Sequence, residues 1–169
     1  MQNKSRVGDL EILQDLEHER KELLAERIGW GLMILFIGAA LAGLLGAGPL
    51  SQAEAGTRDS GLWVEYNRFE RWESESTITV NVGPRIGPSD QIRLWMDRQS
   101  MESIVIEHLD PAPLRAEAAA GRLTYVFLRA DAAPLSVIFR LKSKKRGGRP
   151  MRIGVEGGPQ TAFTQWIYP

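Results

Sequence analysis

The sequence predicts a mainly β protein: an N-terminal helix and a single transmembrane helix, followed by an antiparallel immunoglobulin-like β-sandwich. Three observations support this fold class. Residues 28–53 contain no charged residue. From residue 61 onward, apolar residues recur at every second position, which is the period of a half-buried strand. These alternating runs are short, and turn sequences rich in glycine and proline separate them, as expected for a sandwich of about 110 residues.

We expect four segments along the chain. They are a cytoplasmic helical arm at residues 1–27, a transmembrane helix at 28–50, a stalk at 51–60 and an exterior β-sandwich domain at 61–169. The arm has a helix-forming composition without proline. Its leucines do not keep a clean heptad, so it forms either a short coiled coil or a solvated helix that continues the membrane span.

The apolar stretch is interpreted as an uncleaved membrane anchor. Residues 30–47 are almost wholly apolar and, as a helix, extend roughly 27 Å, close to the ~30 Å hydrocarbon core of a bilayer. The preceding segment is acidic and too long for the short basic start of a signal peptide. The alternative is cleavage after Ala55, within Ala53-Glu54-Ala55, which would release a free periplasmic domain.

The distribution of basic residues predicts the orientation of the anchor. Arg20, Lys21 and Arg27 precede the apolar stretch, whereas only Arg58 follows it closely. Because Lys and Arg near a span favour the cytoplasmic side, we expect a single-pass protein with a cytoplasmic N-terminus and its C-terminal domain on the opposite side. The resemblance described below implies that the membrane is a bacterial inner membrane and that this domain is periplasmic.

Small residues recur at every fourth position of the predicted membrane helix. One row is Gly38, Ala42 and Gly46, and the adjacent row is Ala39, Gly43 and Ala47. Such rows let two helix backbones approach closely. They predict packing against a partner helix or a second copy of the chain, although glycine and alanine are also common in membrane helices in general.

The alternating runs predict seven or eight strands. They cover residues 62–66, 78–82, 92–96, 104–106, 123–127, 135–141 and 151–155, with a last run at 163–168. Trp95 or Trp166 is a candidate for the core tryptophan of such a sandwich. The alanine-rich residues 114–120 are expected to form a single helical turn.

The first strand contains a break in its period. Leu62, Val64 and Tyr66 alternate, and the next apolar residue, Phe69, is out of phase. Such a slip is typical of a bulge or kink by which a strand passes from one sheet to the other. The charged residues of this segment are then expected to lie mostly outward, either in cross-strand ion pairs or as a partner-binding face. They are Glu65, Arg68, Glu70 and Arg71.

A basic hairpin is the most prominent charged feature of the exterior domain. Lys142, Lys144, Lys145, Arg146 and Arg149 surround a Gly-Gly pair that favours a tight turn. The basic residues at its tip are suited to anionic lipid headgroups or to an acidic partner. Alternatively, they only prevent edge-to-edge pairing of a soluble hairpin.

The sequence gives no basis for catalysis, for a metal or cofactor site, or for nucleic-acid binding. The chain has no cysteine and a formal net charge of zero. It has neither a Gly-x-Ser-x-Gly nor a His-Glu-x-x-His motif. In "IVIEHLDPAP", Glu107 and His108 point to opposite faces of a strand, so we interpret His108 as a locally hydrogen-bonded residue rather than a ligand.

Two short motifs carry a resemblance to a known group. Gly48-Pro49-Leu50-Ser51 follows the apolar stretch, and "VEYNRFER", residues 64–71, follows soon after. In this combination the chain resembles small single-pass proteins of proteobacterial inner membranes for which no activity is established. The resemblance implies a membrane-protein partner, with a YetF-like protein as one candidate.

We therefore expect a non-enzymatic accessory or structural subunit of the inner membrane, in contact with lipid and with a membrane-protein partner or a second copy. Glu65, Arg68 and Arg71 are its candidate partner-binding residues. The alternative function is a periplasmic ligand-binding or sensor module.

Overall fold

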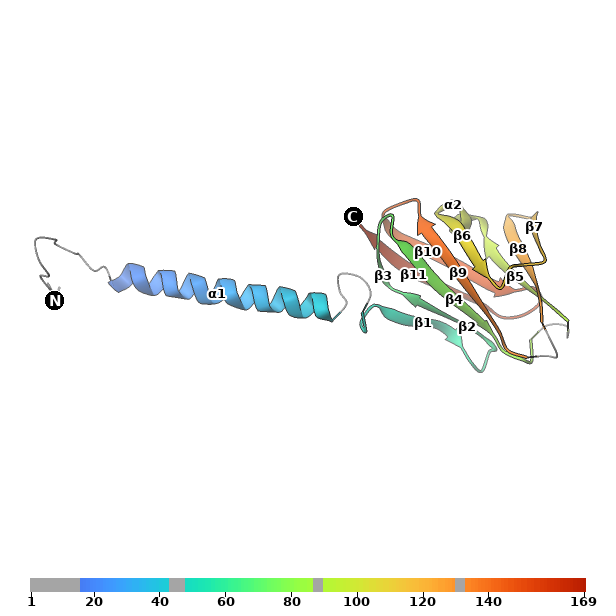
Figure 1. The fold of residues 1–169 in the computed structure, drawn as a ribbon, viewed down its shortest axis with the longest axis horizontal. Helices are drawn as coiled ribbons and strands as arrows, with labels where there is room; N and C mark the ends of the chain where they lie inside the picture. The colour runs from blue at the N-terminus through green and yellow to red at the C-terminus, as the bar shows by residue number, and fades with distance from the viewer. Residues whose placement is uncertain (1–15, 43–47, 87–89, 130–132) are drawn as a thin grey trace, which may run out of the picture. The chain divides into compact units, whose positions relative to one another are not determined.

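The computed structural model describes residues 16–42, 48–86, 90–129 and 133–169. The chain divides into two compact units, Met1–Ala39 and Ala40–Pro169. The first contains most of a single helix, and the second is a β-sandwich (Figure 1). Strands account for more than half of the residues that the structure describes, so the predicted fold class, mainly β with an N-terminal helix, is confirmed.

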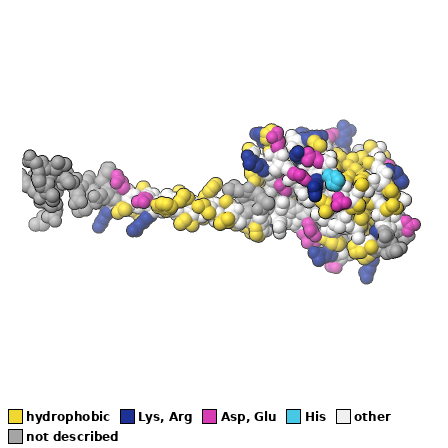
Figure 2. Space-filling model, in the orientation of Figure 1, with side chains coloured by type: hydrophobic (Ala, Val, Ile, Leu, Met, Phe, Trp, Pro, Cys, Tyr) yellow, Lys and Arg dark blue, Asp and Glu magenta, His cyan; other side chains and the backbone are white. Residues whose placement is uncertain are grey.

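Helix α1 (Leu16–Leu41) is continuous and unites part of the predicted arm with part of the predicted anchor. Its segment Arg20–Leu41 has a mean hydropathy of 1.6 and is long and apolar enough to cross a membrane. Figure 2 shows hydrophobic side chains along this helix, with charged side chains toward one end. The expectation of a helix up to residue 50 is wrong, because Gly48–Ser51 form a turn. Pro49 has no N–H for a helical hydrogen bond and disfavours helix in the residue before it.

Two sheets form the sandwich of the second unit. In the described part of the chain, the five-stranded sheet has the order β1-β2-β4-β9-β6 and the six-stranded sheet the order β3-β11-β10-β5-β8-β7. Neighbouring strands are antiparallel except β3 and β11, which are parallel. The strands are β1 (Gln52–Thr57), β2 (Leu62–Asn67), β3 (Phe69–Arg71), β4 (Glu75–Val82), β5 (Gln91–Asp97), β6 (Ile104–Asp110), β7 (Arg115–Ala119), β8 (Arg122–Leu128), β9 (Leu135–Ser143), β10 (Gly147–Val155) and β11 (Gln160–Tyr168).

Each alternating run of the sequence corresponds to a strand, but the predicted stalk is wrong. Residues 52–57 form strand β1, which pairs with β2 from Gln52 opposite Asn67 to Thr57 opposite Leu62. The segment "QAEAGT" has no large apolar residue to show a period of two. It becomes a strand because β2 offers a row of backbone hydrogen-bonding groups along its free edge, and such tertiary context overrides weak β propensity.

The expected helical turn at residues 114–120 is also wrong, because Arg115–Ala119 form strand β7 against β8. A short helix, α2 (Arg98–Glu102), occurs instead after β5. The Asp97 carboxylate accepts a hydrogen bond from the Ser100 backbone N–H at 2.9 Å and caps its first turn. Asp97, a residue type that often caps helices, was therefore the only local signal for this helix.

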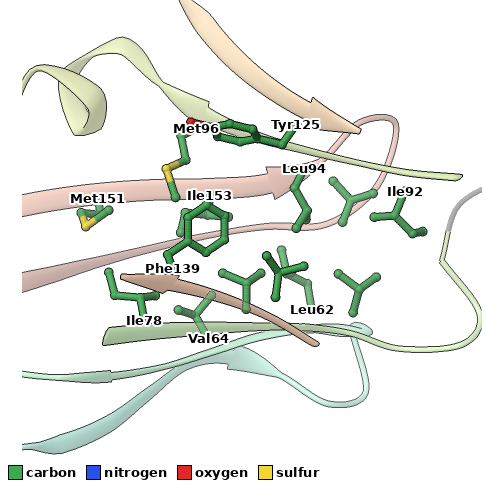
Figure 3. Packing of buried hydrophobic residues seen from close by; sticks show 14 of the residues in the cluster. Leu62, Val64, Ile78, Ile92, Leu94, Met96, Tyr125, Phe139, Met151 and Ile153 are labelled. Atoms are coloured by element: carbon green, nitrogen blue, oxygen red, sulfur yellow. The ribbon is translucent and has the colours of Figure 1, made fainter. Parts of the chain in front are cut away.

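The core lies between the two sheets and follows the alternation of the strands. Val64, Phe139 and Ile153 are fully buried there, and the Tyr125 ring contacts Phe139 edge-on at a centroid distance of 6.1 Å (Figure 3). Trp95 is buried, with 6% of its surface exposed, but neither candidate tryptophan belongs to the apolar cluster between the sheets. Because Leu94 and Met96 point inward, Trp95 points to the outer face of the sheet, where Arg122 covers its ring at 4.1 Å. Trp166 is 56% exposed.

The predicted passage of the first strand between sheets is confirmed. β2 belongs to the five-stranded sheet and β3 to the six-stranded sheet, and Arg68 is the only residue between them. The phase slip between Tyr66 and Phe69 thus marks a real change of sheet.

Candidate functional site

Ser51 attaches the start of the sandwich to this sheet crossover. Its side chain is fully buried. The Ser51 carbonyl accepts a hydrogen bond from the Arg68 N–H at 2.6 Å. The Ser51 hydroxyl donates to the Phe69 carbonyl and accepts from the Phe69 N–H, both at 3.2 Å. The two motifs that carried the resemblance, Gly-Pro-Leu-Ser and "VEYNRFER", therefore contact each other directly.

We call the end of the sandwich that contains Ser51 the crossover end. The strand registers assign further segments to it, since Glu75 pairs with Lys142, Gly147 with Ile167 and Arg71 with Tyr168. The turn between β9 and β10, with Lys144, Lys145 and Arg146, accordingly lies at this end. It is the end at which the chain arrives from α1.

Exposed cations gather at the crossover end. The side chains of Arg68, Arg71, Lys144, Lys145 and Arg146 are all exposed. The Arg146 guanidinium lies 4.0 Å above the centre of the Trp72 ring. The backbone N–H of Lys144 donates to the Ser103 carbonyl at 2.9 Å and attaches the turn to the segment after α2. The predicted basic tip is thus present, but two of its five residues have other roles.

Lys142 and Arg149 are these two exceptions. The Lys142 ammonium lies 2.7 Å from Glu107, and this hydrogen bond raises the pKa of Lys142. Arg149 is only 2% exposed, so the expectation that it belongs to a surface loop is wrong. It alternates in phase with Met151 and Ile153, which places all three side chains on the inner face of β10.

Arg149 belongs to a buried polar group that we call the inner polar cluster, with Asn67, Glu70, Ser76 and Gln165. Arg149 donates to the Gln165 side-chain carbonyl, and the Gln165 amide donates to the Asn67 backbone carbonyl at 2.7 Å. The Glu70 carboxylate accepts from Asn67 Nδ2 at 3.1 Å and from Ser76 Oγ at 3.2 Å. The cluster connects strands of both sheets next to the crossover.

Burial shifts the pKa values of the two charged members of this cluster. Desolvation raises the pKa of Glu70, opposed by hydrogen bonds from Asn67 and Ser76 and by the Arg149 charge. Desolvation lowers the pKa of Arg149 to about 10, opposed by the Glu70 charge. Glu70 was expected to lie mostly outward, and this is wrong, because it is 8% exposed and its carboxylate accepts a hydrogen bond from Ser76 in the opposite sheet.

A hollow of about 590 Å³ lies over β1 and β2, and we call it the β1–β2 hollow. Its lining residues are Gln52, Ala53, Glu54, Arg58, Glu65, Tyr66, Asn67 and Thr77. Glu54 and Glu65 face each other across the two strands. Arg58 approaches Glu54 at 3.9 Å, and Glu65 accepts hydrogen bonds from Trp63 and Asn81 at 3.3 and 3.2 Å. The lining is rich in carboxylate and amide groups and suits a ligand that offers positive charge or N–H donors.

The predicted partner-binding residues do not form one face. Glu65 lines the β1–β2 hollow, Arg68 lies in the crossover, and Arg71 lies on β3 in the other sheet. The sequence did not reveal that Gln52, Glu54 and Arg58 share the hollow with Glu65, because it gave no signal for strand β1.

A second hollow, of about 420 Å³, lies between α2 and the hairpin of β7 and β8. Met101 and residues 118–123 line it with mostly small apolar groups. His108 is exposed on β6, next to a register shift between Ile106 and His108. Within the described ranges, no three His, Asp or Glu side chains gather in a geometry that could hold a metal ion.

The small-residue rows lie only partly in the described chain. Gly38 and Ala39 belong to α1 and Ala42 follows it, whereas Gly43, Gly46 and Ala47 lie outside the described residues. A methyl group added at Gly38 would meet no other atom within 4 Å. Gly29 and Gly31 have the same open surroundings, so this observation does not distinguish the small-residue row from the rest of the helix.

No protein-family model matches this chain, and the comparison with curated proteins finds no significant match.

Proposed function

We propose that this protein is a non-enzymatic, single-pass accessory subunit of the bacterial inner membrane, whose helix α1 and periplasmic sandwich dock on a membrane-protein partner. The attachment of Ser51 to the sheet crossover carries this proposal. Only residues 42–51 separate α1 from β1, so the link extends at most about 35 Å. A domain held this close to the bilayer is suited to a partner that is itself in the membrane.

The same attachment argues against release by cleavage. A cut after Ala55 would divide β1 between the pair Ala55–Val64 and the pair Gly56–Trp63. It would remove Ser51 together with its hydrogen bonds to Arg68 and Phe69. An uncut anchor keeps this edge of the five-stranded sheet intact.

Two surfaces are assigned to the partner. Gly38 and the other small residues of its row would face a membrane helix, since they allow close backbone approach. The acidic β1–β2 hollow would receive a Lys- or Arg-bearing segment of the partner outside the membrane, because Glu54 and Glu65 lie opposite each other there. The same hollow favours the alternative function, a periplasmic ligand-binding module, because it could also hold a small ligand.

Affinity purification of the full-length protein in mild detergent tests the proposal. We expect a stoichiometric membrane protein to co-purify, and to be lost with the double variant Glu54→Lys/Glu65→Lys. The double variant Asp90→Lys/Asp110→Lys reverses two exposed carboxylates outside the hollow; it is the matched control and should keep the companion. A monomer without a companion in several detergents would contradict the accessory role and favour the ligand-binding alternative.

The helix surface has its own test. Leucine at Gly38, Ala42 or Gly46 keeps the segment apolar while preventing close approach of a second backbone. Crosslinking to the partner, or to a second copy, should fall in these variants and persist in the control Ile34→Leu. Unchanged crosslinking in all three variants would mean that the small residues only reflect membrane-helix composition.

A further inference from the structure

The crossover end has more exposed basic side chains than carboxylates, and its net charge is therefore positive. Among the described residues, Arg68, Arg71, Lys144, Lys145 and Arg146 form no ion pair within 4.0 Å, and the neighbouring Glu75, Glu102 and Glu107 are paired with other basic residues. Glu73, which is exposed in the turn between β3 and β4, offsets only one of the five positive charges. Glu102 is held by Arg98 at 2.7 Å, which lowers the pKa of Glu102, and the charges of Lys145 and Lys144 lower it slightly further. Five exposed cations therefore remain available for an anionic surface.

Aromatic and apolar side chains lie among these cations. Trp72 lies beneath the Arg146 guanidinium, Trp166 is 56% exposed, and Leu50 is 53% exposed just before Ser51. Trp166 packs near Gly148, next to the basic turn. Tryptophan combined with Lys and Arg is the composition that proteins place at the headgroup level of a bilayer.

The crossover end is the part of the sandwich that follows α1 most closely along the chain. α1 is apolar enough to cross a membrane, and the chain that leaves it enters the sandwich at Ser51. The two hollows described above are lined by other residues than the five cations. An extended anionic layer, such as a bilayer surface, matches this arrangement.

We propose that the crossover end is a lipid-binding surface, on which Arg68, Arg71, Lys144, Lys145 and Arg146 bind anionic phospholipid headgroups and Trp72 and Trp166 lie at the interface. This lipid-binding role rests on the membrane anchoring of α1 that is part of the Proposed function, and not on the identity of any protein partner. The sandwich then lies with its crossover end on the bilayer and leaves the outer face of β1 and β2 accessible.

The absence of native cysteine permits a direct test with a single attached dye. The full-length variants Gly148→Cys, beside the basic turn, and Ser136→Cys, on β9 toward the opposite end, each receive one environment-sensitive fluorophore. Each labelled protein is reconstituted into nanodiscs of phosphatidylcholine, with or without phosphatidylglycerol. We expect the emission at position 148 to shift to the blue only with phosphatidylglycerol, and the emission at 136 not to change.

Charge variants identify the groups responsible. Neutralising Lys144, Lys145 and Arg146 to glutamine should weaken docking by about a hundredfold, since each basic residue near an anionic surface contributes about a fivefold effect. Raised salt should act in the same direction. The matched control removes the same charge from exposed positions elsewhere, with Arg85, Arg115 and Arg152 changed to glutamine, and should keep the shift.

Three results would overturn the proposal: no shift at position 148, an equal shift in both lipids, or a shift that requires an added membrane protein, which would assign the cations to a protein partner. Flotation distinguishes a chain that is not anchored from one that is anchored but does not bind headgroups. An unanchored chain would not float with phosphatidylcholine nanodiscs at all. That result would contradict both this proposal and the Proposed function. A chain that floats without the lipid-dependent shift would contradict this proposal alone.

Discussion

The interior of the sandwich has two regions that are equally shielded from water but chemically opposite. In the middle, Val80, Val137 and Phe139 are completely buried among other apolar side chains. Near the crossover end, Arg149, Glu70 and Gln165 are buried to a similar extent. In both regions, strand phase decides which side chains face inward. Their chemistry decides whether that burial stabilises the fold by removing apolar area from water or has to be offset by hydrogen bonds.

The inner polar cluster also has a geometric consequence. Apolar contacts are non-directional and tolerate small shifts, whereas the hydrogen bonds from Asn67 and Ser76 to Glu70 specify one position for β3. The cluster thereby holds the crossover, Ser51 and the start of the sandwich in one arrangement. Four substitutions test this comparison, in order of decreasing expected effect.

The largest effect is expected in the apolar middle. Phe139→Ala should lower the free energy of unfolding by about 4 kcal/mol, because it removes a fully buried ring and leaves a cavity. Urea unfolding of the full-length protein in detergent, followed by tryptophan fluorescence, measures this value. A loss below about 1 kcal/mol would mean that the core collapses around the change and is less closely packed than described.

Arg149→Met should cost about 3 kcal/mol, because the Gln165 carbonyl loses its donor and the Glu70 charge loses its nearby countercharge. The double variant Arg149→Met/Glu70→Gln removes the remaining buried charge and should recover a large part of this loss. The same urea titration compares the single and double variants. Purely additive losses would contradict electrostatic coupling between the two side chains.

The pH dependence of stability separates the two regions further. Because burial raises the pKa of Glu70, the native state retains this proton at pH values at which the unfolded chain has released it. The stability contributed by protonated Glu70 is complete below the ordinary glutamate pKa of 4.5 and is lost as the pH rises through the higher native value. The slope within that window is at most about 1.4 kcal/mol per pH unit.

The measurement compares urea midpoints of the native protein and Glu70→Gln from about pH 4 to about pH 8. The glutamine variant cannot titrate at this position, so the difference between the two proteins should change with pH, in favour of the variant at higher pH. A difference that is constant over the range would contradict the raised pKa of Glu70. In Arg149→Met, the pKa of Glu70 should rise further, since the positive charge that lowers it is gone.

The smallest effect is expected at the attachment point. Ser51→Ala removes two hydrogen bonds to Phe69 and should cost about 1 kcal/mol. Ser136→Ala, at an exposed position on β9, is the matched control and should stay within about 0.5 kcal/mol of the native protein. Equal effects of both changes would mean that Ser51 does not stabilise the crossover.

Part of the inner polar cluster could have been predicted from the sequence. Arg149 is in phase with Met151 and Ile153, and Gln165 is in phase with Phe163 and Ile167, so both share the inner face of their strands. Because both side chains are polar, a search for alternating apolar residues did not include them. Glu70 gave no such signal, because β3 has three residues and is too short to show a period.

The elements that could be predicted from the sequence are those whose own side chains create a recognisable pattern. An uncharged stretch sufficed for the apolar helix, alternating residues for eight strands, and the slip before Phe69 for the change of sheet. Three features became visible only in the folded chain: "QAEAGT" and "RAEAA" are strands, Ser51 forms hydrogen bonds with Phe69, and Glu54 lies opposite Glu65. The physical reason is that these features depend on backbone groups and side chains supplied by distant segments, which the local order of residues does not specify.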